Sequence, residues 1–237
     1  MTARSSIEVL VIDDGSVTRT ITFTGNNVFS DSTLRDAMEL STPNWLTWYS
    51  KRDQYSRQKL GADLESIRSY YLNRGFLDFR IESTQVSISP DKNDIFINVN
   101  LFEGERYTVS GVKLSGELLG LEEELTALID VKPGETFNAE KINAIAKRIT
   151  DRMATLGYAF ATANPMPEPD KENRTVAFTI VVDPGRRVYV RRVNIGGNTR
   201  TKDEVIRREM RQYESAWFDS EKVRLSRDRI DRLGFFE

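Results

Sequence analysis

The chain has 237 residues, of which 39% are hydrophobic and 30% charged, and its net charge is −2. Histidine and cysteine are absent, which excludes an imidazole base, a thiol nucleophile and metal sites built from His and Cys, and we expect no cofactor. The nearly neutral charge also lacks the basic footprint of a protein that binds nucleic acid.

Three helical stretches of the chain each end in a glycine followed by an aromatic residue. These marker glycines stand 82 and 77 residues apart: Gly75, Gly157 and Gly234. Solenoid repeats have periods of roughly 20–50 residues, so this longer spacing is that of a small domain. A second set of glycines, each at a turn, keeps a similar period, and we predict that they are the hinges between modules: Gly15, Gly104 and Gly185.

These glycines divide the chain into one isolated strand and three modules. We expect residues 1–15, with a strand at Ile7–Ile12, to be the end of a preceding module. Residues 16–103 and 104–185 are predicted to be complete modules, and residues 186–237 a third module that lacks its hairpin. The chain is therefore expected to be a piece of a longer array.

The first module has the order strand, helix, helix, hairpin. Its strand is predicted at Arg19–Thr24, and Asp31 or Ser32 can cap the helix that follows. A longer helix then carries a single apolar stripe: Leu60, Leu64, Ile67 and Tyr71. The hairpin is predicted from two runs, Phe76–Ser89 and Ile95–Leu101. The returning run alternates cleanly, which indicates that one face of the sheet is buried.

A loop between these two helices contains three aromatic residues. The loop is Pro43–Tyr55, and the aromatic residues are Trp45, Trp48 and Tyr49. Such a cluster can anchor a binding partner. More often it folds back onto the domain as a small satellite core, and we favour this second interpretation.

The second module repeats the same order. It has a predicted strand at Val112–Ser115 and a hairpin with the runs Tyr158–Glu168 and Val176–Val182. Its longer helix again has one apolar stripe: Ile142, Ile145, Ile149, Met153 and Leu156. Each module is therefore β-α-α-β-β, an α+β fold in which two helices pack on one face of a small three-stranded mixed sheet.

The third module begins with a predicted strand at Arg191–Ile195. Thr201 and Glu204 have the spacing of a capping box at the start of its first helix. The second helix carries a weaker stripe with a serine in the seam: Val223, Ser226, Ile230 and Leu233. We expect the same pair of helices as in the other modules.

Several strings of residues show a resemblance to a known family. They are Leu64–Leu72, Ser83–Ser87, Arg207–Gln212 and Arg232–Phe236. With the β-α-α-β-β order, these strings resemble POTRA domains, and more closely the third to fifth POTRA domains of outer-membrane β-barrel assembly factors. The resemblance covers nearly the whole chain; the first two modules, the end of the fifth and the membrane barrel of such proteins have no counterpart in it.

The resemblance implies a location and a set of partners. POTRA domains of this kind lie in the periplasm, attached to the outer membrane through a C-terminal barrel of the same chain. The implied partners are unfolded outer-membrane β-barrel proteins, accessory lipoproteins and that barrel, with no nucleic acid. The resemblance implies no catalysed chemistry and no catalytic, cofactor or metal residues.

An unfolded β-barrel protein presents extended strands, and an exposed sheet edge can bind a strand through main-chain hydrogen bonds alone. The outer strand of the second module carries Pro165, Pro167 and Pro169, which lack N–H donors and make a poor docking template. The outer strand of the first module, Phe76–Ser89, contains no proline. We therefore predict that it is the docking edge for a substrate or an accessory protein.

The alternation slips within this strand of the first module. Phe79 and Ile81 share one parity, whereas Val86 and Ile88 share the other, and this phase change predicts a bulge around Ser83–Gln85. The predicted docking residues are Phe79, Ile81, Ser83, Gln85, Val86 and Ile88. The alternative is that this strand is only the outer strand of a hairpin and binds nothing.

Charge distinguishes the third module from the others. Residues 186–237 hold 14 Lys and Arg against 9 Asp and Glu, a net charge of +5, while the rest of the chain is net negative. Arg207 and Arg211 are spaced i, i+4, and Glu214 follows just beyond them. We predict that these three residues form a face for an accessory protein or for lipid headgroups; the alternative is an ordinary solvated helix surface.

Two other functions remain as alternatives. The chain could be the POTRA region of a secretion or translocation transporter. It could also be an enzyme domain with a carboxylate pair, in which case two acids must converge in a deep pocket.

Overall fold

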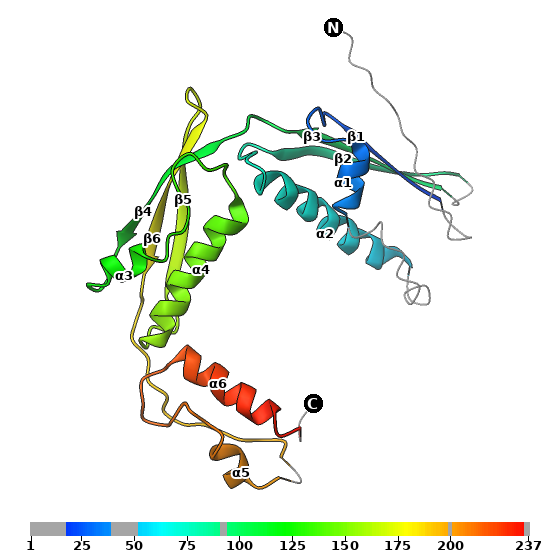
Figure 1. Cartoon of the computed structure of the whole chain (residues 1–237). Coiled ribbons are helices and arrows are strands. Elements are labelled where there is room, and N and C mark those ends of the chain that lie inside the picture. Colours follow the sequence, from blue (N-terminus) through cyan, green and yellow to red (C-terminus); the bar gives the residue numbers. More distant parts are fainter. Residues whose placement is uncertain (1–17, 39–51, 91–93, 199–200, 235–237) are drawn as a thin grey trace. The chain divides into compact units, whose positions relative to one another are not determined.

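The computed structural model describes residues 18–38, 52–90, 94–198 and 201–234 (Figure 1). Five features predicted from the sequence lie outside these residues: the strand Ile7–Ile12, the hinge Gly15, and the loop aromatics Trp45, Trp48 and Tyr49. The chain has two compact units. The first is Met1–Thr108 with Glu135–Glu140, and the second is Val109–Gly134 with Lys141–Glu237.

The first unit contains a three-stranded mixed sheet with the strand order β1-β3-β2. Its elements are β1 (Thr18–Thr24), α1 (Asp31–Asp36), α2 (Arg52–Leu72), β2 (Arg80–Ile88) and β3 (Asp94–Phe102). β1 pairs with β3 in parallel, and β2 pairs with β3 antiparallel. Figure 1 shows α1 and α2 on the same side of this sheet, as predicted for a β-α-α-β-β module.

The core of the first unit lies between this sheet and its helices. The side chains with no exposed surface are Leu34 of α1, Ile67 and Tyr71 of α2, and Val99 of β3. Burying an aliphatic or aromatic side chain of this size stabilises the fold by about 1.5–3 kcal/mol. The predicted stripe on α2 and the predicted alternation of β3 are therefore both confirmed at these positions.

The second unit repeats the arrangement with the strand order β4-β6-β5. Its elements are β4 (Thr108–Gly116), α3 (Glu122–Thr126), α4 (Ala139–Thr155), β5 (Thr162–Asp170) and β6 (Thr175–Asp183). The predicted stripe of α4 is buried at Ile142, Ile145, Ile149 and Met153. β6 buries every second residue: Val176, Phe178, Ile180 and Val182.

The same unit contains two more helices, α5 (Asp203–Arg207) and α6 (Ser220–Asp231). The predicted strand Arg191–Ile195 is wrong, because this segment joins no sheet. The residue before it, Val190, instead bonds to a loop: its N–H donates to Ala216 O at 2.9 Å, and its carbonyl accepts from Ser215 N at 2.7 Å. In the other modules the first strand belongs to a sheet with the hairpin strands, and the described residues of the third module contain no hairpin.

Two predicted helix caps are also wrong. The N-cap of α1 is Ser30, whose Oγ accepts from Thr33 N at 3.3 Å. The N-cap of α5 is Lys202, with no side-chain cap. A residue before the helix stabilises this turn instead: the Asn198 carboxamide donates to Thr201 O at 2.8 Å and to Asp203 Oδ1 at 3.0 Å.

The helix α6 buries only part of its predicted stripe. Val223 is 41% exposed, whereas Ser226 in the seam is buried. Both hairpins also begin later than predicted, since β2 starts at Arg80 and β5 at Thr162. No helix in the described part of the chain is both long and apolar enough to cross a bilayer.

Candidate partner-binding surfaces

The predicted docking strand β2 is an edge of its sheet, because β3 pairs with it on one side only. Val86 lies opposite Ile97 of β3 and is 52% exposed. Ser83 and Gln85 are also exposed. Among the described residues, the other side of this strand has no pairing partner, which is the geometry that strand addition requires.

The predicted bulge is present, at Glu82 rather than at Ser83–Gln85. Ile81 pairs with Leu101 and Ser83 with Asn100, so Glu82 is the extra residue. Residues directly opposite each other point to the same face of a sheet. The bulge thus places Ile81 and Val86 on the face of the buried β3 side chains, although their sequence parities differ.

Two of the predicted docking residues do not support the prediction: Phe79 is buried, and the side chain of Ile88 is not described. Phe79 lies before β2 and is 3% exposed. Its ring stacks on Tyr71 with centroids 4.1 Å apart and planes at 11°, because Phe79 N donates to Phe76 O at 3.2 Å and this turn points the ring into the core. Ile88 ends β2, and only its backbone is described.

The corresponding edge of the second sheet is β5. Pro165, Pro167 and Pro169 lie opposite Ile180, Phe178 and Val176 of β6. Backbone N–H groups of alternate residues in an antiparallel strand point to the same side, and a proline has no N–H to give to the ladder. The three prolines therefore occupy outward-facing positions and remove donors from the open side of β5.

Two of the three residues in the predicted charged face lie together. Arg207 Nη1 lies 3.3 Å from Glu214 Oε1, and Arg207 Nη2 donates to Val193 O at 3.1 Å. The same carboxylate oxygen accepts Val193 N at 2.9 Å. The Val193 N–H, and then the Arg207 guanidinium, hold the pKa of the Glu214 carboxyl below its ordinary value. This pair ties the segment before α5 to the loop after it.

Arg211 does not share a helix face with Arg207. α5 ends at Arg207, so Arg211 lies outside the helix and its i, i+4 spacing from Arg207 does not put the two side chains on one helix face. The Arg211 guanidinium lies instead against two backbone carbonyls, 3.2 Å from Met210 O and 3.4 Å from Arg208 O.

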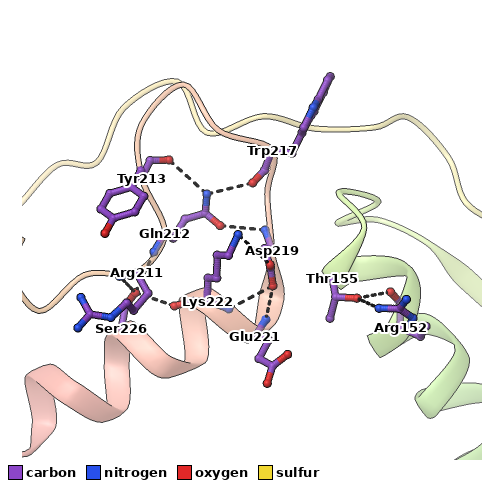
Figure 2. A network of polar contacts seen from close by, with 10 residues as sticks. All are labelled: Arg152, Thr155, Arg211, Gln212, Tyr213, Trp217, Asp219, Glu221, Lys222 and Ser226. Atoms are coloured by element: carbon purple, nitrogen blue, oxygen red, sulfur yellow. Dashed lines mark hydrogen bonds and ion pairs between the residues drawn. The ribbon is translucent and has the colours of Figure 1, made fainter.

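A polar network between α5 and α6 was not predicted (Figure 2). The buried Gln212 side chain donates to Trp217 O at 3.1 Å and accepts from Asp219 N at 2.9 Å. The buried Ser226 hydroxyl accepts from Arg211 N at 2.7 Å and from Gln212 N at 3.2 Å. The only sequence signal was the serine in an apolar seam. These contacts connect the 211–219 loop to α6.

Two predicted hinge glycines lie in the described residues, with φ of +72° at Gly104 and +63° at Gly185. A Cβ on Gly104 would lie 2.9 Å from Asp78 Cβ. Both positions therefore favour glycine, because a residue that has a Cβ is strained at such φ. Their role as hinges remains a prediction.

The marker glycines contact the start of the next predicted module. Gly75 O accepts from Tyr107 N at 2.8 Å, and Gly157 O accepts from Val188 N at 2.8 Å. An arginine next to each contact donates its Nε to the carbonyl before the glycine: Arg106 to Arg74 O at 3.1 Å and Arg187 to Leu156 O at 2.9 Å. The repeated sequence marker thus corresponds to a repeated backbone joint.

Comparison with known proteins identifies the family. The family model described as "POTRA: Surface antigen variable number repeat" matches residues 17–104, 107–185 and 188–237. The chain belongs to the POTRA family. Among solved structures, the POTRA chain is similar to Haemophilus influenzae BamA POTRA3-5, with a TM-score of 0.80 and 35% identity over 94% of this chain and 87% of the other.

Curated relatives agree with this assignment. The outer membrane protein assembly factor BamA of Neisseria meningitidis is 35% identical over 239 residues, covering 99% of the POTRA chain and 30% of the relative. BamA of Neorickettsia risticii is 31% identical over 223 residues, covering 94% and 30%. The POTRA chain therefore spans about a third of the length of these relatives. Both relatives are named as outer membrane protein assembly factors.

Proposed function

We propose that the chain is a periplasmic, polypeptide-binding scaffold in outer-membrane protein assembly. It would bind unfolded outer-membrane β-barrel proteins and accessory lipoproteins, and connect them to a C-terminal barrel of the same protein. We further propose module boundaries at residues 16–103, 104–185 and 186–237. The near full-length similarity to BamA POTRA3-5 supports this proposal.

The observation that carries the binding mode is the open edge of β2. It has no proline, and no other strand in the described part of the chain pairs with its outer side, whereas the other hairpin edge, β5, carries three prolines. A strand of an unfolded barrel protein can extend the β1-β3-β2 sheet through main-chain hydrogen bonds. Such binding tolerates many substrate sequences, because backbone groups are the same in all of them.

The test introduces proline at two neighbouring positions, Gln85→Pro and Val86→Pro. Neighbouring N–H groups of a strand point in opposite directions, so one variant loses a bond to β3 and the other loses only an outward donor. Thermal unfolding identifies the second variant, because it keeps the stability of the parent. We expect that variant to bind a urea-unfolded β-barrel protein at least about tenfold more weakly, equivalent to about 1.4 kcal/mol.

The matched control is Val86→Thr, which changes the side chain and keeps the N–H. It should bind as the parent does if main-chain hydrogen bonds carry the interaction. Equal binding by the stable proline variant and the parent would contradict docking on β2. A photoreactive residue at Gln85 in the intact protein in cells should form crosslinks to substrates or accessory proteins.

A second surface is supported by charge. The pair of Arg207 and Glu214 lies in the segment with a net charge of +5, and we propose this pair, and separately Arg211, as contacts for an accessory lipoprotein or for lipid headgroups. Each of these side chains also bonds within the chain, so a test must separate partner contact from local stability.

A further inference from the structure

The second and third modules contain the same backbone bridge with different side chains. In the second module, Thr108 bridges to Thr136; in the third, Tyr189 bridges to Trp217, each partner 81 residues later in the chain. The hydrogen bond beside the bridge is also the same in both: Phe137 N to Tyr107 O at 3.0 Å and Phe218 N to Val188 O at 2.9 Å. Threonines are therefore sufficient for this bridge, and the fold does not require the two aromatic residues.

Both aromatic side chains are accessible. Tyr189 is 58% exposed and Trp217 is 51% exposed. Their rings meet edge to face, with centroids 6.5 Å apart and planes at 87°. Figure 2 shows the Trp217 ring pointing away from the polar network around Gln212. Exposed aromatic side chains that lie together are characteristic of binding surfaces.

A hollow of about 580 Å³ lies beside this pair. It is lined by the end of α4, by Arg187 and Tyr189, and by residues 215–219 and Lys222 at the start of α6. Pockets that bind small ligands or anchoring side chains typically have about 300–1,000 Å³. We call this surface the aromatic hollow; it has room for one or two side chains of a partner.

The charges around the aromatic hollow favour an anionic partner. The Arg187 guanidinium lies 4.3 Å from the centre of the Trp217 ring, and Lys222 is half exposed. The only carboxylate in the lining is Asp219, which already accepts the N–H groups of Glu221 and Lys222 as the N-cap of α6. Lys222 Nζ lies 3.4 Å from Asp219 Oδ2, so this pair is close to neutral and the Arg187 guanidinium leaves the lining with a net positive charge.

The aromatic hollow is also held in place before any partner binds. Gln212 fixes the carbonyl of Trp217 and the N–H of Asp219, and Ser226 fixes the preceding turn (Figure 2). A surface that is ordered in advance loses less conformational entropy on binding.

We propose that the aromatic hollow binds a short acidic segment of a partner polypeptide. An apolar side chain of that segment packs against Tyr189 and Trp217, and an adjacent carboxylate lies near Arg187 and Lys222. The class of partner rests on the proposed polypeptide-binding function, and the site is separate from the edge of β2.

The test uses the whole chain and a fluorescein-labelled peptide of alternating aspartate and phenylalanine, with binding followed by fluorescence anisotropy. The variant Tyr189→Thr/Trp217→Thr installs the residues that make the same bridge in the second module, so it is expected to fold. Phe160→Thr, which removes a 75% exposed aromatic side chain elsewhere, is the matched control. We expect the double variant to bind about tenfold or more weakly and the control to bind as the parent does.

Charge is tested in the same assay. Lys222→Glu should weaken binding, while Lys171→Glu, at the exposed turn between β5 and β6, makes the same change in net charge and should not. A peptide of alternating lysine and phenylalanine should bind more weakly than the acidic peptide. Equal binding of the acidic peptide by the parent and the double variant would overturn the proposal.

Vesicles of phosphatidylglycerol distinguish a membrane from a peptide partner. Loss of vesicle binding in the double variant, with no binding of the acidic peptide to the parent, would assign the aromatic hollow to lipid and overturn the proposal. Failure of β2 docking is detected separately, because the stable proline variant at position 85 or 86 leaves the aromatic hollow unchanged and should bind this peptide normally.

Discussion

The phenol of Tyr71 in α2 donates a hydrogen bond of 2.8 Å to Glu103, which directly follows β3, and both side chains are buried. The same carboxylate accepts Asn27 N at 2.9 Å and Val28 N at 3.1 Å. It therefore connects the longer helix, the sheet and the loop before α1. The corresponding positions of the second module, counted from the marker glycine and the hinge glycine, are Met153 and Pro184.

The first prediction concerns this pair. Tyr71→Phe removes one donor from a buried carboxylate and should lower the free energy of unfolding of the first unit by about 1–3 kcal/mol. Glu103→Gln should also lower this free energy of unfolding, and the loss in the double variant should differ from the sum of the two single losses. Chemical denaturation of the four proteins measures the coupling. Fully additive effects would contradict a direct interaction.

The second prediction concerns alkaline pH. Burial, and then the hydrogen bond to Glu103, raise the pKa of the Tyr71 phenol well above its ordinary value. A raised pKa in the folded state means that the stabilisation is complete below the unfolded pKa of about 10 and is lost as the pH rises further. The unfolding free energy of the parent should thus fall above about pH 10. Tyr71→Phe should fall less steeply there, and parallel curves would contradict this assignment.

The third prediction concerns the marker glycines. Gly157 has φ of +102°, and a Cβ there would lie 3.0 Å from Arg187 Cγ. Gly157→Ala should destabilise the second unit by about 1–2 kcal/mol, because an L-residue is strained at this φ. Gly61→Ala is the control: this glycine is inside α2 with nothing near its Cβ position, so alanine should stabilise by roughly 0.5–1 kcal/mol. Thermal unfolding distinguishes the two directions.

The fourth prediction concerns the serine in the seam of α6. Ser226→Ala leaves the N–H groups of Arg211 and Gln212 without their acceptor and should cost about 1–3 kcal/mol. Ser66→Ala, which removes an exposed hydroxyl bonded to Ala62 O, should change stability by less than about 0.5 kcal/mol. Hydrogen exchange should become faster at the amides of Arg211 and Gln212 in the Ser226 variant. Unchanged exchange there would show that the hydroxyl does not hold the loop.

The fifth prediction concerns the proposed accessory-protein face. Arg207→Glu breaks the contact with Glu214 and reverses the charge, whereas Arg207→Glu/Glu214→Arg reverses both charges and keeps a pair. If a partner makes electrostatic contacts with these two side chains, both variants should lose binding to that partner in a pull-down. Recovery of binding in the double variant would show that only the local pair matters. Since the pKa of Glu214 is lowered, any stability from this pair is present above about pH 4.3 and is lost as the pH falls further.

Local patterns in the sequence predicted much of the fold. The stripes on α2 and α4 and the alternation of β3 and β6 are confirmed, because each records which side of a regular element faces an apolar core. The phase slip in β2 predicted a bulge to within one residue for the same reason. The predicted caps, the strand Arg191–Ile195 and the position of Phe79 were wrong, because each depends on where the chain turns next.

The sequence by itself determined the repeat of the glycine markers, the helix and strand order of the first two modules and the family, since these depend on periodicity and on runs of neighbouring residues. Tertiary structure alone decided which side chains meet across the chain. It joined Tyr71 to Glu103 and Arg207 to Glu214, separated Arg211 from that pair, and placed Tyr189 beside Trp217. Such contacts depend on where the chain turns between the two residues, and no local pattern records a distance between two loops.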